Sequence, residues 1–459
     1  MLIDSKPTDT KPAVNYYELF IPGKKDAVVV LQNLLRSRII TTYLMYEQNN
    51  EVRIAGNELV KVSVSQDSVS LKGMGTSSSV PVTDPFQQVA ELLNALPIEG
   101  WTAYGYVAFD IAGFYSAYSK SIQQDLLCFF IPEIELRFTD KGVYVKTNRS
   151  VEQICSLLCI ESELANYVPK PVVVDFSDRE GYQNQIKTLI KAIQNSELHK
   201  AILARSLKIT GELDVLGTYI VGAKANNSAR SYCFNLGDVQ AVGFSPEILM
   251  NVSQDGFVTT NPLAGTRPRG KSLAEDTQLN GELLTDAKEV KEHALSIWLA
   301  QQEISSICLP ETVRVCQFMD IKKYRCVQHL SSRVGGQLKP NNTLWDALKI
   351  LFPGITVSGI DKAKALEWID RLEDEPRGIY AGGIGWINSE GMADLAIAIR
   401  SVYQYGNCIS LNAGAGIVAE SIPENEYMES VNKMNTMLTN LVFKSGTYGA
   451  TRQGIGNRQ

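Results

Sequence analysis

Segments with the two-residue period of a β-strand and segments with the 3.6-residue period of an α-helix follow one another along most of this chain. The strand-like segments alternate apolar and polar residues, whereas the helical segments repeat apolar residues every three or four positions. Clear strand-like segments are VRIAGNELVKVSVS (52–65), GVYVKTN (142–148) and ISLNAGAGIV (409–418), and clear helical segments are GYQNQIKTLIKAIQNSELHK (181–200), LWDALKILF (344–352) and ALEWIDRL (365–372). This mixture predicts an α/β or α+β fold.

The sequence contains no clear boundary between domains. At 459 residues and 44% hydrophobic content, length alone would allow about two to four domain-sized units. However, the chain has no internal repeat and no Pro/Gly/Ser-rich linker, and its weakest seam lies near 165–180. We therefore predict one domain over 15–443, made of a smaller section 15–170 and a motif-rich section 171–443, between polar tails 1–14 and 444–459 that we expect to be disordered.

Charge and cysteine content exclude several classes of protein. The net charge is -6, and acidic and basic residues are mixed along the chain, which argues against nucleic acid or an anionic membrane as partner. We also find no signal peptide and no apolar run of the roughly 20 residues needed to cross a bilayer. The eight cysteines form no CxxC pair, so we expect reduced thiols in a cytoplasmic protein. With only three histidines, a metal would depend mainly on oxygen ligands.

The segment KEVKEHALS (288–296) places Glu289 and Glu292 three positions apart on a predicted helix. At 100° per residue, both point away from an apolar stripe that consists of Leu283, Ala287, Val290, Ala294 and Ile297. The two acids are therefore expected to face water, with Lys288 paired to Glu292 as one simple interpretation. The wall of a water-filled cleft would have the same pattern.

A second helical segment, SIPENEYMESVNKMNTML (421–438), repeats this spacing with Glu426 and Glu429. Ser421 and Glu424 are spaced as a capping box, Pro423 suits the first turn, and the apolar stripe comprises Tyr427, Val431, Met434 and Leu438. Alone, these acids fit a helix N-terminus, where the helix dipole favours them. If the two helices faced each other, four carboxylates would converge, and such a cluster would favour Mg²⁺.

The segment NAGAGIV (412–418) precedes the second helix and offers small residues, including Gly414, Ala415 and Gly416. We interpret it either as a tight bend or as backbone that a ligand can approach beside a helix start that attracts anions. Since GxGxxG and GxxxxGK[ST] motifs are absent from the sequence, a carboxylate is a more natural anion than a nucleotide phosphate.

Two further residues could transfer protons. Lys200 begins a predicted strand, where it is either a solvated surface residue or, in a cleft, a general base. Glu247 follows a turn at Ser245-Pro246 in an apolar hairpin, and it either points outward or is held protonated as a general acid.

Nine motifs resemble, in order, those of the chorismate-binding family, which includes anthranilate, aminodeoxychorismate, isochorismate and salicylate synthases. They run from about 198 to 440 and read KAILAR, GFSPE, NPLAGTRPRG, KEVKEHALS, VQHLSS, TVSGIDKAKAL, RGIYAGGIG, AIAIRSVYQ and AGAGIVAESIPENEYMESVNKM. The section before residue 170 is similar mainly through TTYLMYE. The resemblance implies a Mg²⁺-dependent enzyme with two antiparallel sheets and a cleft beneath helices.

The resemblance also implies roles for individual residues. Glu292 and Glu429 would bind Mg²⁺ directly, and Glu289 and Glu426 would bind it through water. The metal and the backbone of 414–416 would bind the ring carboxylate. Lys200 would activate the attacking water, and Glu247 would protonate the departing C4 hydroxyl. Tyr380 and Arg400 would bind the enolpyruvyl carboxylate. Thr266 and His329 would contact the ring, and Lys433 would lie beside the metal.

Within the family, Lys200 resembles the branch that uses water, because relatives that use ammonia generally have a glutamine-like residue there. VQHLSS and Thr266 look like salicylate synthases, which also release pyruvate and usually supply siderophore assembly. This implies a monomer without an amidotransferase subunit. Two features depart from that branch. Asn261 stands where salicylate synthases tend to have an acid, and TRPRG and YAGGIG are closer to anthranilate synthases. Isochorismate synthase, an amine-transferring synthase and an inactive chorismate-binding relative remain alternatives.

Overall fold

The computed structural model describes residues 15–172, 174, 177–325 and 327–444. The predicted tail 1–14 lies outside the described residues, as does the tail 444–459 except for Lys444. The backbone N–H of Lys444 donates a 2.9 Å hydrogen bond to the carbonyl of Glu212.

The strands form two antiparallel sheets, as expected, but two long strands belong to both of them. In hydrogen-bonded order, the first sheet consists of β1 (Tyr17–Pro22), β8 (Gly142–Thr147), β7 (Leu127–Phe138), β3 (Glu51–Val64), β2 (Tyr43–Gln48), β10 (Arg230–Asn235), β11 (Val239–Ser245), β20 (Ser401–Tyr405), β21 (Cys408–Ile417), β9 (Lys200–Thr210) and β17 (Gly359–Ile360). The second consists of β5 (Thr76–Pro81), β4 (Ser68–Gly73), β3, β7, β6 (Thr102–Val107), β18 (Gly383–Asn388), β19 (Ala393–Ile397), β12 (Ile248–Val252), β13 (Phe257–Thr260), β16 (Val327–Gln337) and β15 (Arg314–Lys323), and β14 (Leu263–Pro268) also pairs with β16.

The strands β3 and β7 connect the two sheets because each contributes one half to either sheet. Their pairing shifts register between Glu58 and Val60, opposite Pro132. Such a bulge bends a strand and increases its twist, which lets the two halves of β3 take different neighbours. The section before residue 170 and the section after it therefore share both sheets, through the pairs β2–β10 and β6–β18.

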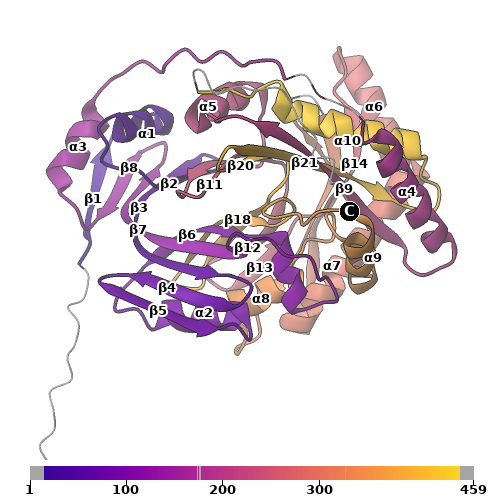
Figure 1. Cartoon of the computed structure of the whole chain (residues 1–459), viewed down its shortest axis with the longest axis horizontal. Helices are drawn as coiled ribbons and strands as arrows, with labels where there is room; N and C mark the ends of the chain where they lie inside the picture. Colours follow the sequence, from indigo (N-terminus) through magenta and orange to yellow (C-terminus); the bar gives the residue numbers. More distant parts are fainter. Residues whose placement is uncertain (1–14, 173, 175–176, 326, 445–459) are drawn as a thin grey trace, which may run out of the picture.

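Helices cover the outer sides of this two-sheet arrangement. Figure 1 shows α5 and α10 above the first sheet and α2 and α8 below the second. The helices are α1 (Ala27–Arg36), α2 (Pro85–Asn94), α3 (Val151–Cys159), α4 (Arg179–Gln194), α5 (Val215–Ala225), α6 (Leu273–Thr285), α7 (Ala287–Ile307), α8 (Leu344–Leu351), α9 (Lys362–Leu372) and α10 (Pro423–Leu438), with short 3₁₀ turns η1 (Phe109–Phe114) and η2 (Pro310–Thr312). Residues 160–172, which follow α3, run across the molecule as an extended connection (Figure 1).

The core follows the alternation of the strands. On β2, Leu44 and Tyr46 face the space between the sheets, whereas Tyr43 and Met45 pack under the helices outside the first sheet. Across the interior, the rings of Tyr106 on β6 and Phe234 on β10 stack with centroids 6.1 Å apart. This two-sided burial holds the strand ends, from which the functional side chains project, at fixed positions.

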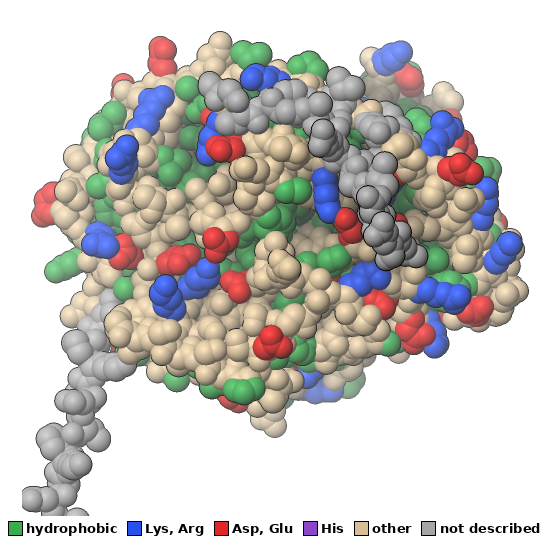
Figure 2. Space-filling model, viewed as in Figure 1, with side chains coloured by type: hydrophobic (Ala, Val, Ile, Leu, Met, Phe, Trp, Pro, Cys, Tyr) green, Lys and Arg blue, Asp and Glu red, His purple; other side chains and the backbone are tan. Residues whose placement is uncertain are grey.

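The surface agrees with the mixed charge of the sequence. On the face seen in Figure 2, acidic and basic side chains are interspersed. No helix in the described part of the chain is both long and apolar enough to span a bilayer.

The helix α7 differs from the stripe expected from its sequence. Ala287 and Ala294 are exposed, whereas His293 and Ser296 are buried. The cause is tertiary hydrogen bonding, because His293 Nε2 lies 2.8 Å from the Ser332 hydroxyl on β16. Leu283 belongs to the separate helix α6, which ends at Thr285, and Asp286 separates it from α7.

The helix α10 confirms its predicted apolar stripe, since Tyr427, Val431, Met434 and Leu438 are all buried. The predicted capping box is wrong: Ile422 is the N-cap residue, without a side-chain cap, and the Ser421 hydroxyl accepts a hydrogen bond from the Val418 N–H instead. Pro423 occupies the first turn, as predicted.

Candidate active site

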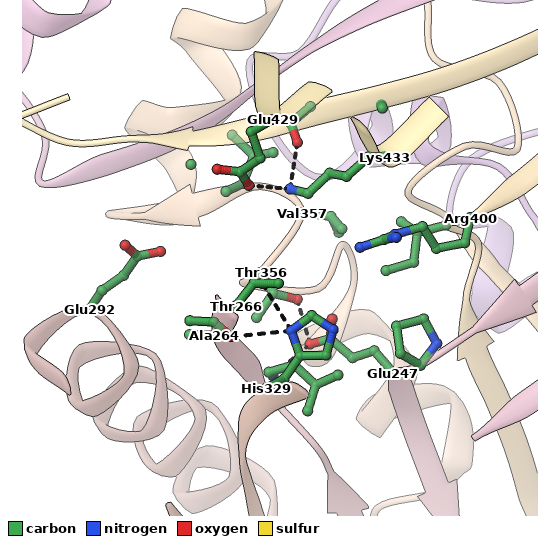
Figure 3. A pocket seen from close by; sticks show the side chains of 18 of the residues that line it. Glu247, Ala264, Thr266, Glu292, His329, Thr356, Val357, Arg400, Glu429 and Lys433 are labelled. Atoms are coloured by element: carbon green, nitrogen blue, oxygen red, sulfur yellow. Dashed lines mark hydrogen bonds and ion pairs between the residues drawn. The ribbon is translucent and has the colours of Figure 1, made fainter. Parts of the chain in front are cut away.

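A single cavity collects most of the predicted functional residues. Its wall is formed by strand ends from both sheets together with α7 and α10. The predicted residues that line it are Lys200, Glu247, Thr266, Glu292, His329, Tyr380, Arg400, Gly414, Gly416, Glu429 and Lys433. Figure 3 shows Glu292, Arg400, His329 and Glu429 approaching the same space from different elements. Chain segments more than 200 residues apart in sequence thus meet at one site.

Three predicted residues lie beside the cavity rather than in its wall. Ala415 is fully buried among α4 and α10 side chains. Glu289 Oε1 lies 3.5 Å from Arg267 Nη1, and Glu426 Oε1 lies 3.9 Å from Lys288 Nζ. Glu426 is only 6% exposed, so it is buried although it lies outside the apolar stripe of its helix.

Glu247 is buried in the turn between β11 and β12 and is 4% exposed. Its Oε1 accepts hydrogen bonds from the Thr356 hydroxyl at 2.6 Å and from the Leu263 N–H at 3.0 Å. Burial raises the pKa of Glu247 to about 7, although these hydrogen bonds and the nearby Lys200 ammonium oppose the increase. A carboxyl group with this pKa can donate a proton near neutral pH. The outward-facing alternative is therefore wrong.

Lys200 is the first residue of β9, as predicted, but it is not a surface lysine. It is 4% exposed, and its ammonium forms a short ion pair with Glu292 on α7. The pair spans the two elements that wall the cavity on this side. Lys288, which could have paired with Glu292 along the helix, is directed toward α10 instead.

His329 on β16 offers an unpaired nitrogen to the cavity. Its Nδ1 lies 2.9 Å from the Thr266 hydroxyl and 3.1 Å from the Gly265 carbonyl. Since a carbonyl only accepts hydrogen bonds, Nδ1 carries the proton and Nε2 is a free acceptor. Nε2 is buried and has no partner among the described residues. Burial and the Arg400 charge lower the pKa of His329 to about 4, so the ring is neutral.

Arg400 and Tyr380 form the cationic end of the cavity. Within the described chain, the Arg400 guanidinium makes no hydrogen bond or ion pair. Burial raises the pKa of Tyr380 to about 12, so its hydroxyl keeps its proton. A guanidinium matches a carboxylate in a two-pronged geometry, and an unpaired guanidinium beside a phenol is thus suited to a carboxylate ligand.

The helix α10 brings a second ion pair to the cavity. Lys433 Nζ lies 2.6 Å from Glu429 Oε1 and donates a 2.8 Å hydrogen bond to the carbonyl of Gly414. Burial opposes ionisation of Glu429, but the charges of Lys433 and Arg400 lower its pKa. Glu429 is therefore an anion at neutral pH.

The glycine-rich segment lies within β21 and not after it, because residues 414–416 pair with β9. The other neighbour of β21, β20, pairs with it only as far as Leu411, so the following residues leave one strand edge beside the cavity. At Gly416, an added Cβ would lie 2.9 Å from Lys200 Cε and 3.3 Å from Glu292 Oε1. An added methyl group here would therefore press on the neighbouring ion pair. Of the two interpretations of this segment, the tight bend is wrong.

The four glutamates fit Mg²⁺ by their chemistry, although they are not drawn together. Among the described residues, no group of three His, Cys, Asp or Glu side chains lies close enough to hold a metal ion. Burial, and then the second carboxylate on the same helix, raises the pKa of Glu289, and burial and Glu429 raise that of Glu426. Carboxylate oxygens are the donors that Mg²⁺ prefers. Metal binding stays a prediction.

The sequence reasoning did not single out Thr356 or Asn412, which also line the cavity. Thr356 is the more consequential omission, because it donates the shortest hydrogen bond to Glu247. Thr356 begins the motif TVSGIDKAKAL, and Asn412 begins the segment NAGAGIV. No local period distinguishes them.

Comparison with known proteins identifies the family of this chain. The family model described as chorismate binding enzyme matches residues 41–439. The chain is 31% identical over 430 residues to a salicylate synthase of Mycolicibacterium paratuberculosis, which covers 91% of this chain and 94% of that protein. It is 40% identical over 268 residues to an anthranilate synthase component 1 of Haloferax volcanii, over 58% of this chain and 51% of that protein.

A solved structure extends the comparison to three dimensions. Anthranilate synthase component I from Streptococcus pneumoniae superposes with a TM-score of 0.74 at 30% identity, over 85% of this chain and 92% of that one. The two-sheet architecture is therefore that of a known enzyme. With a family match that extends through both sheets, the chain belongs to the chorismate binding enzyme family.

Proposed function

We propose that this protein is a Mg²⁺-dependent salicylate synthase that converts chorismate, through isochorismate, to salicylate and pyruvate. The observation that carries the proposal is the presence of Lys200 and of the protonatable Glu247 in one cavity that also holds the unpaired Arg400. Support comes from the salicylate synthase relative, which is similar over 91% of this chain.

The first reaction exchanges one hydroxyl group for another across the ring. Lys200, in its neutral form, would take a proton from water as the oxygen attacks C2. Glu247 would give its proton to the C4 hydroxyl, which leaves as water, so that one water is consumed and one is released. Arg400 and Tyr380 would hold the enolpyruvyl carboxylate, and His329 Nε2 would accept a hydrogen bond from the ring side. In the second reaction, pyruvate leaves in a pericyclic step for which the cavity mainly fixes the conformation.

The residues that would hold Mg²⁺ are Glu292 and Glu429 directly, and Glu289 and Glu426 through water. A bound Mg²⁺ would supply positive charge for the ring carboxylate and would replace Lys200 as the cation at Glu292. Because an ammonium has no lone pair, Lys200 can act as a base only after it has lost its proton. The small residues Gly414 to Gly416 leave room for the substrate carboxylate beside the strand.

A second candidate is an amine-transferring synthase. The observation in its favour is the 40% identity to an anthranilate synthase component 1 over the motif-rich part of the chain. An isochorismate synthase that stops after the first reaction is a third outcome of the same assay. The water-using reaction is preferred because Lys200 lines the cavity.

The decisive experiment is incubation of the purified protein with chorismate and Mg²⁺, followed by salicylate fluorescence and a coupled assay for pyruvate. We expect equal amounts of salicylate and pyruvate. Accumulation of isochorismate without pyruvate would limit the function to the first reaction. An aminated product that forms only with ammonia would replace the proposal by the second candidate.

We further propose that the enzyme acts as a cytoplasmic monomer without an amidotransferase subunit, since water needs no delivery by a partner. Size-exclusion chromatography with light scattering would test the oligomeric state. A mass of two chains or more would contradict it.

A further inference from the structure

A fully buried ion pair lies just behind the cavity wall and contacts two of its segments. Arg377 Nε lies 2.9 Å from Glu373 Oε2, and the two side chains are 1% and 5% exposed. The remaining guanidinium nitrogens donate 2.7 Å hydrogen bonds to the backbone carbonyls of Val357 and Ile202. Glu373 Oε1 in turn accepts a 2.8 Å hydrogen bond from the Ala204 N–H. Every polar atom of the pair is thus engaged with a defined partner.

The two carbonyls belong to the segments that carry functional side chains. Ile202 follows Lys200 by two residues on β9, and its N–H bonds to the Ser358 carbonyl. Val357 directly follows Thr356, the residue that donates to Glu247. The guanidinium therefore joins the strand of Lys200 to the loop of Thr356, and no more flexible group could span both carbonyls with fixed geometry.

We propose that Arg377 and Glu373 are positioning residues that hold Thr356 in hydrogen-bonding range of Glu247. Arg377 does not line the cavity, so it acts through the backbone of Val357. The aromatic ring of Phe109, with its centroid 4.3 Å from the Arg377 guanidinium carbon, restricts the guanidinium further. The proposal goes beyond the proposed function and depends on it only for the role of Glu247.

Other charged groups near Glu247 also influence its titration, and their influence must be distinguished from the positioning of Thr356. Lys200 on β9 and Lys433 on α10 lower its pKa, Tyr324 before β16 lies nearby, and Arg400 lines the same cavity. The substitution Arg377→Lys keeps the positive charge and alters none of these groups. A change in Glu247 titration must then come from displacement of the loop.

The experiment is an infrared titration of the protonated Glu247 carboxyl band in the free enzyme, with the band assigned by its loss in Glu247→Gln. We expect Thr356→Val to move the titration upward by about one pH unit, because the carboxylate loses a hydrogen bond. Arg377→Lys should move it in the same direction. The shift in the double variant Thr356→Val with Arg377→Lys should not exceed the larger of the two single shifts. Both substitutions remove the same hydrogen bond to Glu247, so their effects do not add.

Glu373→Gln provides a second variant if Arg377→Lys folds poorly. Loss of a negative charge would by itself move the titration downward, so an upward movement in Glu373→Gln can only come from loosened positioning. The matched control is Arg53→Lys, a partly buried arginine that pairs with Glu51 on β3 at 2.7 Å. It should leave the Glu247 band unchanged.

An unchanged titration in Arg377→Lys and Glu373→Gln, or additive shifts in the double variant with Thr356→Val, would overturn the proposal. Because the readout needs no turnover, an inactive wild-type enzyme would contradict the proposed function without affecting this result. With active enzyme, Arg377→Lys should lower kcat by about tenfold with little change in KM, since Arg377 does not touch the substrate cavity.

Discussion

Lys200 and Glu292 form an ion pair inside the cavity, although one begins a strand and the other lies 92 residues later on a helix. The pair places a nitrogen suited to proton transfer against a carboxylate suited to metal binding. A ligand that binds Lys200 must therefore displace Glu292, and a cation that binds Glu292 must displace Lys200.

Lys200→Ala removes the proposed base. We expect kcat for chorismate consumption to fall by at least about 100-fold, as for loss of general-base catalysis, while Mg²⁺ still binds. Turnover and isothermal titration with Mg²⁺ are the measurements. Lys208→Ala is the control, because Lys208 lies on the same strand but pairs with Glu375 outside the cavity at 2.6 Å. Wild-type activity in Lys200→Ala would refute its role as base.

Glu292→Gln and Glu429→Gln each replace a charged oxygen ligand by a neutral amide. We expect each to abolish Mg²⁺-dependent turnover and to weaken Mg²⁺ binding measured by calorimetry, because Mg²⁺ prefers carboxylate donors. The control is Glu282→Gln, whose carboxylate bonds to Gln278 along the exposed helix α6. Undiminished activity in either variant would dismantle the proposed metal site.

Glu247→Gln should change how stability depends on pH. The pKa of Glu247 is raised by burial from 4.5 to about 7, so the native state retains a proton that the unfolded state releases. The wild-type free energy of unfolding therefore decreases as pH rises through that window, by about 3 kcal/mol, and levels off above it. Glutamine cannot ionise, so this decrease should disappear. Urea denaturation of both proteins at about pH 4.5 and about pH 8, which span this window, measures the difference. An equal change in the free energy of unfolding in both proteins would contradict the prediction.

Gly416→Ala tests the close approach of β21 to the ion pair. The new methyl group would press on Lys200 Cε and Glu292 Oε1, and we expect kcat to fall by about tenfold to 100-fold through misplacement of these groups. Gly281→Ala is the matched control, since nothing lies within 4 Å of its added Cβ and alanine favours the helix α6. Equal activity in the two variants would show that the site tolerates the displacement.

Arg400→Gln removes the unpaired cation. We expect KM for chorismate to rise by about tenfold to 100-fold, because a charge-assisted hydrogen bond to the carboxylate is lost. Arg400→Lys should recover only part of the affinity, since lysine lacks the planar fork. Steady-state kinetics measures both, with the exposed Arg371→Gln as control. A KM unaffected in Arg400→Gln would show that the carboxylate binds elsewhere.

The sequence predicted those parts of the site that depend on motif and local period. Lys200 at the start of its strand, Glu247 after the Ser245-Pro246 turn and the apolar stripe of α10 agree with the structure. The helix α7 was predicted, but part of its apolar stripe was wrong, because buried His293 is stabilised by Ser332 on a distant strand. No period within a single helix contains that information.

Contacts between remote segments also explain what the sequence could not show. Thr356 has no local feature that marks it, and its role follows only from the 2.6 Å hydrogen bond to Glu247, 109 residues away. In the same way, the shared use of β3 and β7 depends on pairing across the whole chain. Two sheets were predictable by resemblance, but their connection was not.

The shared strands β3 and β7 have a consequence for the synthesis of the protein. While the chain emerges from the ribosome, β2 and β6 are open edges, because their partners β10 and β18 lie far downstream. Unpaired edges of this kind promote association between chains, and distant pairings slow folding. We therefore expect nascent chains of this enzyme to need protection from aggregation until the partner strands have been made.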